Sequence, residues 1–355
     1  MSKSAPVRFS PTVETPEVHE AETIEGMQTT LRSILDTTAE HYHHAVRAVH
    51  AKGHALVEAR FEVLDDLPPE LAQGLFAAPA SYAAVLRMST VPGDILPDGI
   101  SGPRGIALKV YGVPGARLGG SEADSTQDFV MVNGPVFGTP DARHFLSNLK
   151  LLAKTTDRVE GLKLVISSTL QVTERLLESV GLSSTTVQAL GGAPNTNPLG
   201  ETYYSQTAFR YGDYIAKFAL VPVSANLTAR KAEPVDTHNR PDALREEIGR
   251  TLAGGDSVWE LRVQLCTDLD VMPIEDASKV WDEKLSPYVA AARLLVPAQP
   301  SWTAASVAAE DALAFSPWHG LAAHQPLGSV NRVRREVYTM SSEFRSRVNG
   351  CPAMH

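Results

Sequence analysis

The sequence predicts an α+β protein in which an antiparallel β-sheet or barrel is flanked by helices. Several segments alternate apolar and polar residues with period 2 and are separated by turns containing Gly, Pro and Asp, the pattern of half-buried antiparallel strands. Helical stripes stand before and after these segments. The expected strands are 54–63, 83–91, 104–111, 127–132, 203–211, 214–221 and 257–267.

Helices are predicted at 25–47, at 141–190 with a break near Asp157 and Gly161, and at 329–348. Residues 285–330 show few regular patterns and many prolines. Long irregular segments in compact proteins usually serve a function, so we expect this one to wrap a site or the outside of a barrel. Residues 1–22, rich in Pro, Glu, Ser and Thr, are expected to form a flexible arm before a single domain over 23–355.

Composition excludes several classes of protein. With 355 residues, 43% of them hydrophobic, the chain can bury a large core. A net charge of -9 argues against a broad nucleic-acid or anionic-membrane surface. No run of 18 apolar residues predicts a membrane span, and the N-terminus lacks the apolar core of a secretory signal. Cys266 and Cys351 fit neither a disulfide framework nor a zinc cluster. We therefore expect buried free thiols and a cytoplasmic location.

Histidines are concentrated near the start of the chain, at 41, 43, 44, 50 and 54. His50 and His54 have a spacing that a metal site could use, but no HExxH run or nearby carboxylate pair accompanies them. Solvated helix residues plus one core histidine are the simpler interpretation. His50 stands out because it lies in RAVHAKG at 47–53, one turn after Arg47 and directly before a predicted strand. The backbone on both sides would hold its ring toward a fixed target.

Arg334 and Tyr338 lie four residues apart in RREVY, hence on one face of the last predicted helix. A neighbouring Arg favours the phenolate form of Tyr, and Tyr is one of the known axial ligands of haem. Arg345 falls on the same face two turns later. Taken alone, an Arg and a Tyr at this spacing are common on helix surfaces, and an ordinary surface pair is then the favoured interpretation.

Taken together, the motifs resemble those of monofunctional haem catalases. RAVHAKG at 47–53 with FEV at 61–63 resembles the segment of the family that carries the distal histidine. The other similar segments, in family order, are RMSTVPGD at 87–94, GPRGIALKVY at 102–111, VNGPVF at 132–137, KVW at 279–281, LAFSP at 313–317 and RREVY at 334–338 with Arg345. The resemblance spans residues 45 to 349 and implies the catalase-like antiparallel β-barrel, wrapping loop and flanking helices.

The resemblance also implies roles for individual residues. His50 would be the distal base, Asn133 its amide partner over the iron, and Ser89 the hydroxyl bonded to the far nitrogen of His50. Tyr338 would be the iron ligand on the proximal side, and Arg334 its charge partner. Arg47, Arg87 and Arg345 match the arginines that pair with haem propionates, and Phe315 would pack near the haem.

The activity implied is the consumption of peroxide with haem b as cofactor. His50 would take a proton from one peroxide oxygen and return it to the other. The expected partners are hydrogen peroxide or an organic hydroperoxide, a small organic electron donor, and further copies of the same subunit.

Departures from the family pattern predict a wider distal side. Gly138 follows Phe137 where catalases usually carry a second Phe, and Gln206 replaces the His of the usual SHT. The chain is shorter than a typical catalase and resembles compact catalase-related haem proteins, some of which are peroxidases. A wider site would admit bulkier substrates, so we expect a peroxidase with weak catalase activity.

Two alternatives stay open. An enzyme that rearranges hydroperoxides, or transfers their oxygen to a larger molecule, would also use a wide haem site. Val49 argues against the allene oxide synthase version, in which a Thr stands before the histidine. A haem-binding protein without catalysis is the other alternative. The combination of His50, Ser89 and Asn133 argues against it, because binding alone needs no proton shuttle.

Overall fold

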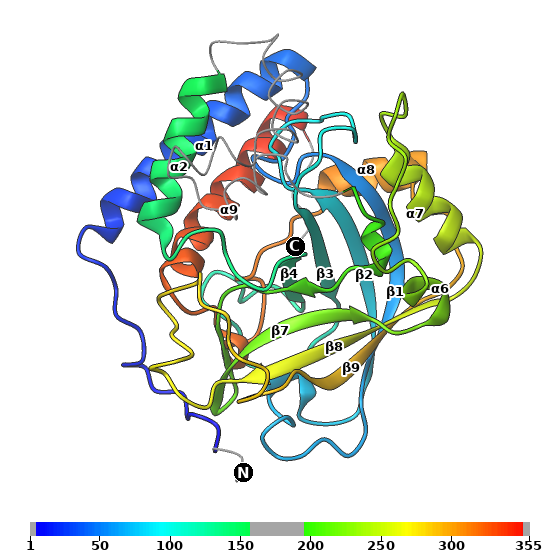
Figure 1. The fold of residues 1–355 in the computed structure, drawn as a ribbon. Helices are drawn as coiled ribbons and strands as arrows, with labels where there is room; N and C mark the ends of the chain where they lie inside the picture. Colours follow the sequence, from blue (N-terminus) through cyan, green and yellow to red (C-terminus); the bar gives the residue numbers. More distant parts are fainter. Residues whose placement is uncertain (1–4, 157–194, 351–355) are drawn as a thin grey trace.

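The computed structural model describes residues 5–156 and 195–350, and its centre is a closed antiparallel β-barrel of eight strands. The strand order is β5-β4-β3-β2-β1-β9-β8-β7, and pairing of β5 with β7 closes the ring (Figure 1). The strands are β1 Gly53–Val63, β2 Ser81–Thr90, β3 Arg104–Val110, β4 Gln127–Val132, β5 Tyr203–Tyr204, β6 Phe209–Tyr211, β7 Tyr214–Pro222, β8 Ser257–Leu265 and β9 Val289–Val296. The predicted α+β barrel is thereby confirmed.

Helices α1, α2 and α9 lie on one side of the barrel, and α6, α7 and α8 lie on the other (Figure 1). In Figure 1, α1 and α2 lie beside α9 and form a helical layer next to the strand ends. The α-helices are α1 Glu20–Tyr42, α2 Ala142–Thr156, α6 Ala225–Thr228, α7 Ala243–Ala253, α8 Ala304–Ala312 and α9 Ser329–Asn349. Short 3₁₀-helices lie at Gly74–Phe76, Pro198–Gly200 and Ala322–His324. None of the helices in this part of the chain is long and apolar enough to cross a membrane.

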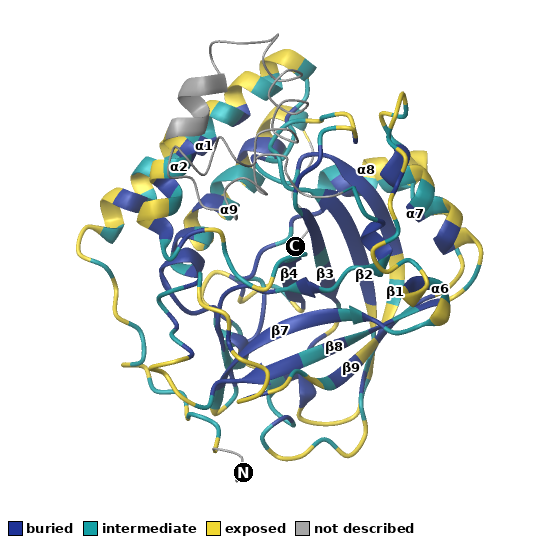
Figure 2. Cartoon of the chain, viewed as in Figure 1, coloured by how far each residue is buried: buried dark blue, intermediate teal, exposed yellow. Residues whose placement is uncertain are grey.

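The core fills the barrel, where the strands are mostly buried (Figure 2). Strand β8 shows why the sequence predicted it, because Trp259, Leu261 and Val263 are fully buried and alternate with partly exposed residues. Phe129 and Phe218 meet edge to face with ring centroids 5.0 Å apart. Their close packing fixes the barrel on which the site is built.

Two predicted boundaries are wrong for identifiable reasons, and a third lies partly outside the described residues. The first helix ends at Tyr42, not near Arg47, because His43 adopts a left-handed conformation with φ of 53°. The strand predicted at 203–211 is two strands, separated where Gln206 has φ of 62°. The predicted helix at 141–190 forms α2 as far as residue 156, and its remainder lies outside the described residues.

The region 285–330 contains more regular structure than the sequence indicated. Strand β9 pairs with both β1 and β8, so the ring depends on it. Helix α8 follows it, with a capping box at Thr303 and Ser306. The rest of this region, around Phe315, runs without long elements, as predicted. Cys266 is a buried free thiol, as predicted, and burial raises its pKa to about 11. Cys351 lies outside the described residues.

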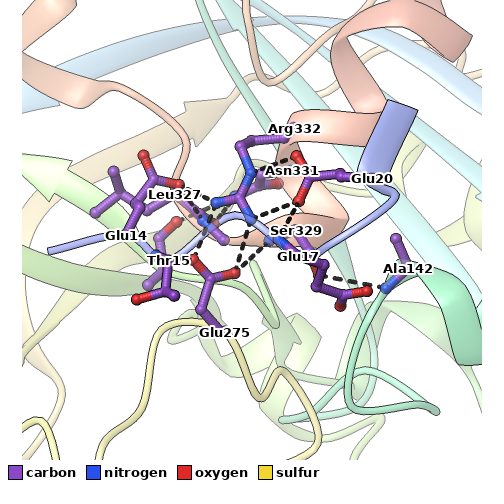
Figure 3. Close-up of polar contacts among 12 residues, drawn as sticks. Glu14, Thr15, Glu17, Glu20, Ala142, Glu275, Leu327, Ser329, Asn331 and Arg332 are labelled. Atoms are coloured by element: carbon purple, nitrogen blue, oxygen red, sulfur yellow. Dashed lines mark hydrogen bonds and ion pairs between the residues drawn. The ribbon is translucent and has the colours of Figure 1, made fainter. Parts of the chain in front are cut away.

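The N-terminal arm has a defined path from residue 5 onward. The Val7 amide donates to the carbonyl of Cys266 at 2.8 Å, and the Phe9 amide donates to the carbonyl of Asp213 at 2.7 Å. Farther along, the arm reaches Arg332 at the start of α9 (Figure 3). The arm therefore joins the barrel to the helical layer.

Arg332 binds three carboxylates from three parts of the chain (Figure 3). Its guanidinium lies 2.6 Å from Glu14 of the arm, 2.7 Å from Glu20 of α1 and 3.0 Å from Glu275 of the β8–β9 connection. Although burial opposes it, hydrogen bonds to Glu20 and Glu275 raise the pKa of Arg332. The Arg332 cluster, meaning these four residues, ties arm, barrel and helices together.

Replacing Arg332 by Met should destabilise the protein by about 3 kcal/mol, because it leaves carboxylates partly buried without their cation. Chemical unfolding of the variant and the wild type measures the difference in the free energy of unfolding. Arg8→Met is the matched control, since Arg8 is largely exposed and its ion pair, with the exposed Asp213, is 3.4 Å long. Equal losses in the two variants would show that the Arg332 cluster adds no stability of its own.

Candidate functional site

His50 lies in the short connection between α1 and β1 and is held on both backbone sides. Its amide donates to the carbonyl of Val91 at 2.7 Å, and its carbonyl accepts from Arg87 at 2.8 Å. Its φ of 56° lies in the left-handed region, which non-glycine residues adopt only when surroundings fix it. The prediction of a histidine pinned at this junction is confirmed, although the segment before it is not helical.

The sheet register places two residues against the ring of His50. Ser89 of β2 lies opposite Gly105 of β3. Ser89 Oγ lies 3.0 Å from His50 Nδ1, the contact that the resemblance implies. A Cβ on Gly105 would stand 2.4 Å from the same nitrogen, so only glycine leaves room for the ring. The barrel thus orients the imidazole and leaves Nε2 to face whatever is bound beside it.

His50 is neutral at any physiological pH. Burial first, and then three arginine charges, lower the pKa of His50 to about 3. The arginines are Arg87, Arg334 and Arg47. A neutral imidazole in a cationic setting can accept a proton at Nε2 while Nδ1–H donates to Ser89, the state that a general base requires.

Asn133 lies at the end of β4, but its amide is bonded to neighbours other than His50. Its Oδ1 accepts from the Arg104 amide at 2.8 Å, and its Nδ2 donates to Glu201 at 2.6 Å. Because Gly105, which contacts the His50 ring, follows Arg104 directly, Asn133 is anchored to the same strand end. Among the described residues, Glu201 is the one partner of this Nδ2, which carries two hydrogens.

The three predicted propionate arginines lie together at the C-terminal end of α8. Arg47 donates to the carbonyls of Glu310 and Leu313, at 2.8 and 2.9 Å. Arg345 donates to the same Leu313 carbonyl at 3.3 Å, and its buried Nε has no partner among the described residues. Arg87 binds the Glu310 carboxylate with Nε at 2.6 Å. Three cations, one of them with an unused buried donor, form a site for anionic groups.

Arg334 points toward the loop that follows β4. It donates to Asn331 at 3.2 Å and to Thr207 at 3.4 Å, and its guanidinium lies 5.6 Å from the ring centroid of Phe137. None of these contacts reaches Tyr338, so its predicted role as charge partner of Tyr338 stays a prediction. Its charge also contributes to lowering the pKa of His50.

Tyr338 and Phe315 line one cleft of about 740 Å³ between α9 and the segment after α8. Ser316 and His319 belong to the same wall. Ser316 is also tied to a fully buried ion pair, in which Lys109 Nζ lies 2.8 Å from Asp128. The Asp128 carboxylate accepts from the Ser316 amide at 3.0 Å. The segment with Phe315 is therefore fixed to the barrel beside Tyr338, and the packing of Phe315 near a haem stays a prediction.

Gly138 and Gln206 are the two positions at which the sequence differs from the catalase pattern in the expected distal region. Gly138 is exposed, and a Cβ on it would meet no described atom within 4 Å. Gln206 donates to the carbonyls of Gly134 and Val136, at 3.1 and 2.6 Å. Gln206 therefore holds the loop after Asn133, and the wider distal side stays a prediction.

No metal cluster takes the place of this site. Within residues 5–156 and 195–350, no three His, Cys, Asp or Glu side chains lie together as a metal site would require. His54 is buried and shares a hydrogen bond with Thr90 through Nε2. In the sequence, it follows Gly53, the first residue of β1, whereas His50 precedes it. The alternative of a metal held by His50 and His54 receives no support from this geometry.

Sequence reasoning missed Glu310, Arg104 and Glu201. Glu310 lies in an Ala-rich segment without a distinctive pattern, and its arginine partners are more than 200 residues away in sequence. Arg104 and Glu201 hold Asn133 from β3 and from the segment before β5. A charged residue inside a predicted strand, as at Arg104, was the one available signal.

A family model named Catalase matches residues 27–323. The chain belongs to the catalase family. Helix α9, with Arg334, Tyr338 and Arg345, lies beyond the matched residues, so its assignment rests on the motifs and on the geometry above. No sequence among the curated proteins matches the chain.

Solved catalase structures share the fold. A bacterial catalase is 17% identical with a TM-score of 0.59, over 96% of this chain and 63% of that one. A fungal catalase is 18% identical with a TM-score of 0.57, over 98% and 69%. Catalase A from Saccharomyces cerevisiae is 17% identical with a TM-score of 0.57, over 96% and 67%. The chain thus spans about two thirds of the length of these catalases.

The catalase family is haem-dependent, and the residues present fit a haem. The arginine group with the unused Nε of Arg345 suits the two propionates. Tyr338, which lines the cleft, is of a residue type that binds haem iron, and would hold the iron there.

Proposed function

We propose that this catalase-family protein is a haem-dependent enzyme that consumes peroxide. The observation that carries the proposal is the neutral, pinned His50, whose ring is bonded to Ser89 while three arginine charges surround it. A protein that merely stored haem would have no need for such a proton acceptor. Free, buried Cys266 further supports a location in the reducing cytoplasm.

In this proposal, haem b is held by Tyr338 at the iron and by Arg47, Arg87 and Arg345 at the propionates. Bound there, the haem would supply the redox chemistry of peroxide cleavage. His50 Nε2 accepts the proton of one peroxide oxygen and delivers it to the other, which then departs as water. The remaining Nδ2 hydrogen of Asn133 is available to stabilise charge on the peroxide.

Peroxide turnover should stay constant from pH 7 down to about pH 5. A depressed His pKa keeps the basic form present at lower pH, and His50 has a pKa of about 3 instead of the usual 6.5. The measurement is kcat/KM for hydrogen peroxide as a function of pH. A fall in kcat/KM with an apparent pKa between 6 and 7 would mean that His50 is not held in this way.

The glycine at 138, where catalases usually carry a second Phe, favours a peroxidase that uses an organic electron donor over a dedicated catalase. A smaller distal side would confine hydrogen peroxide against His50 more tightly. The same glycine is the observation that favours the second candidate, an enzyme that rearranges an organic hydroperoxide or transfers its oxygen.

Comparing substrates separates these candidates. The haem-loaded protein is given hydrogen peroxide or a lipid hydroperoxide, each with and without a phenolic donor, and consumption is measured. We expect hydrogen peroxide to be consumed faster with the donor than without it. Strong preference for the lipid hydroperoxide, with no effect of the donor, would favour the rearranging enzyme instead.

A further inference from the structure

One buried carboxylate, Glu310, sits inside the arginine group. Glu310 Oε1 lies 2.5 Å from Arg87 and 3.3 Å from Arg47. Both arginines are largely buried, with side-chain exposure of 3% and 15%, and that of Glu310 is 11%. Burial alone would raise the pKa of Glu310, but the charges of Arg87 and Arg47 outweigh it and lower the pKa. The carboxylate is therefore ionised among them.

Glu310 belongs to the last turn of α8, where helix carbonyls have no partner within the helix. The carbonyls of Glu310, Asp311 and Leu313 accept from Arg47 and Arg345. This end also carries the negative end of the helix dipole. The end of α8 and the Glu310 side chain thus form one acceptor surface for all three cations.

Without that acceptor surface, nothing described here would offset the repulsion between the three arginine cations. Burial and the charge of Arg87 lower the pKa of Arg345 to about 10, because a buried cation next to another cation is disfavoured. Asp311 also acts on Arg47 and Arg345, but it is a third exposed and pairs with His44. Among the largely buried side chains, three positive charges and the one negative charge of Glu310 leave a net charge of +2, equal and opposite to that of two propionates. With Glu310 neutral, the net charge would be +3 and one cation would stay uncompensated beside the bound haem.

Steric contacts also restrict the position of the Glu310 carboxylate. A Cβ on Gly53, at the start of β1, would lie 2.5 Å from Glu310 Oε1 and 2.7 Å from Trp302. The backbone of β1 therefore approaches the carboxylate closely and leaves it no other place at this strand end. Gly53 has no positive φ, so an alanine there would act through contact with these side chains and not through backbone strain.

We propose that Glu310 is a positioning residue of the haem site, which fixes Arg47 and Arg87 and balances one of the three arginine charges against two propionates. This inference rests on the proposed haem function. The inference makes two predictions about bound haem. The protein retains haem only with the Glu310 carboxylate in place, and the buried negative charge of Glu310 lowers the midpoint potential of the haem.

The test compares Glu310→Gln, Glu310→Asp and wild type after loading with haem b. The first readout is the rate of haem transfer to an excess of a haem-scavenging protein, followed by absorbance. Loss of charge-assisted hydrogen bonds should speed haem loss roughly tenfold in Glu310→Gln. The second readout is the midpoint potential of the bound haem, which should rise in Glu310→Gln and return toward the wild-type value in Glu310→Asp.

Two further variants sharpen the test. Asp311→Asn is the matched control, because Asp311 is a third exposed and pairs with His44 at 3.0 Å; it should change both readouts less. Gly53→Ala displaces the Glu310 carboxylate without removing any charge and should also speed haem loss. It keeps the inference testable if Glu310→Gln does not fold.

The outcomes are distinct. Unchanged or slower haem loss in Glu310→Gln, or in Gly53→Ala where the first variant does not fold, overturns the inference. Slower loss would mean that Glu310 competes with a propionate for the arginines. An unchanged or lower midpoint potential in Glu310→Gln overturns the charge-balancing part. If wild type itself takes up no haem, the proposed function falls and the inference falls with it.

Discussion

Replacing His50 by Ala should lower the rate of peroxide consumption by a factor of about 10² to 10⁴, the usual contribution of a positioned general base. The reason is specific to this site. Ser89 and the space at Gly105 fix the ring, and its pKa of about 3 keeps Nε2 unprotonated. Initial rates with hydrogen peroxide, measured on haem-loaded proteins of equal haem content, give the factor.

His41→Ala is the matched control, since His41 lies in the last turn of α1 with an exposed side chain. It should retain the wild-type rate. Normal turnover in His50→Ala would contradict the role of His50 as base. The haem absorbance of both variants should match wild type, because neither histidine is proposed to bind the iron.

The second large effect is expected for Tyr338→Phe. Phenylalanine has no oxygen to bind iron, so the charge-transfer bands of Tyr-ligated ferric haem should disappear. Peroxide turnover should fall at least as far as in His50→Ala, again by a factor of about 10² or more. Absorption spectra and initial rates of the loaded variant provide both measurements.

Tyr82→Phe serves as its control. Tyr82 lies on β2 and packs against the barrel core, away from the cleft that Tyr338 lines. The control should keep the wild-type spectrum. A wild-type spectrum in Tyr338→Phe would mean that another residue binds the iron, and the assignment of α9 would be wrong.

The sequence predicted the barrel where side chains alternate cleanly, and failed where they do not. In β8 every second residue from Ser257 to Val263 is buried, so periodicity found the strand. In β9 the run Val289–Val296 is rich in Ala, Leu and Val, and its burial does not alternate. It forms a strand because β1 and β8 flank it, which is information from distant parts of the chain.

The same distinction applies to the site. His50, Ser89 and the arginines stood in motifs short enough to be recognised in sequence. Glu310 did not, because its significance comes from partners that the fold brings to it. The bonds of Asn133 to Arg104 and Glu201 were likewise hidden, since they join three separate segments.

The most direct test of the account is a stopped-flow measurement with the haem-loaded protein and one equivalent of hydrogen peroxide. We expect a rapid change in the haem absorption, which a phenolic donor then reverses while being oxidised. In His50→Ala the first phase should slow by the same factor as turnover. Unchanged haem absorption in the wild type after peroxide is added would contradict the proposal that this protein consumes peroxide.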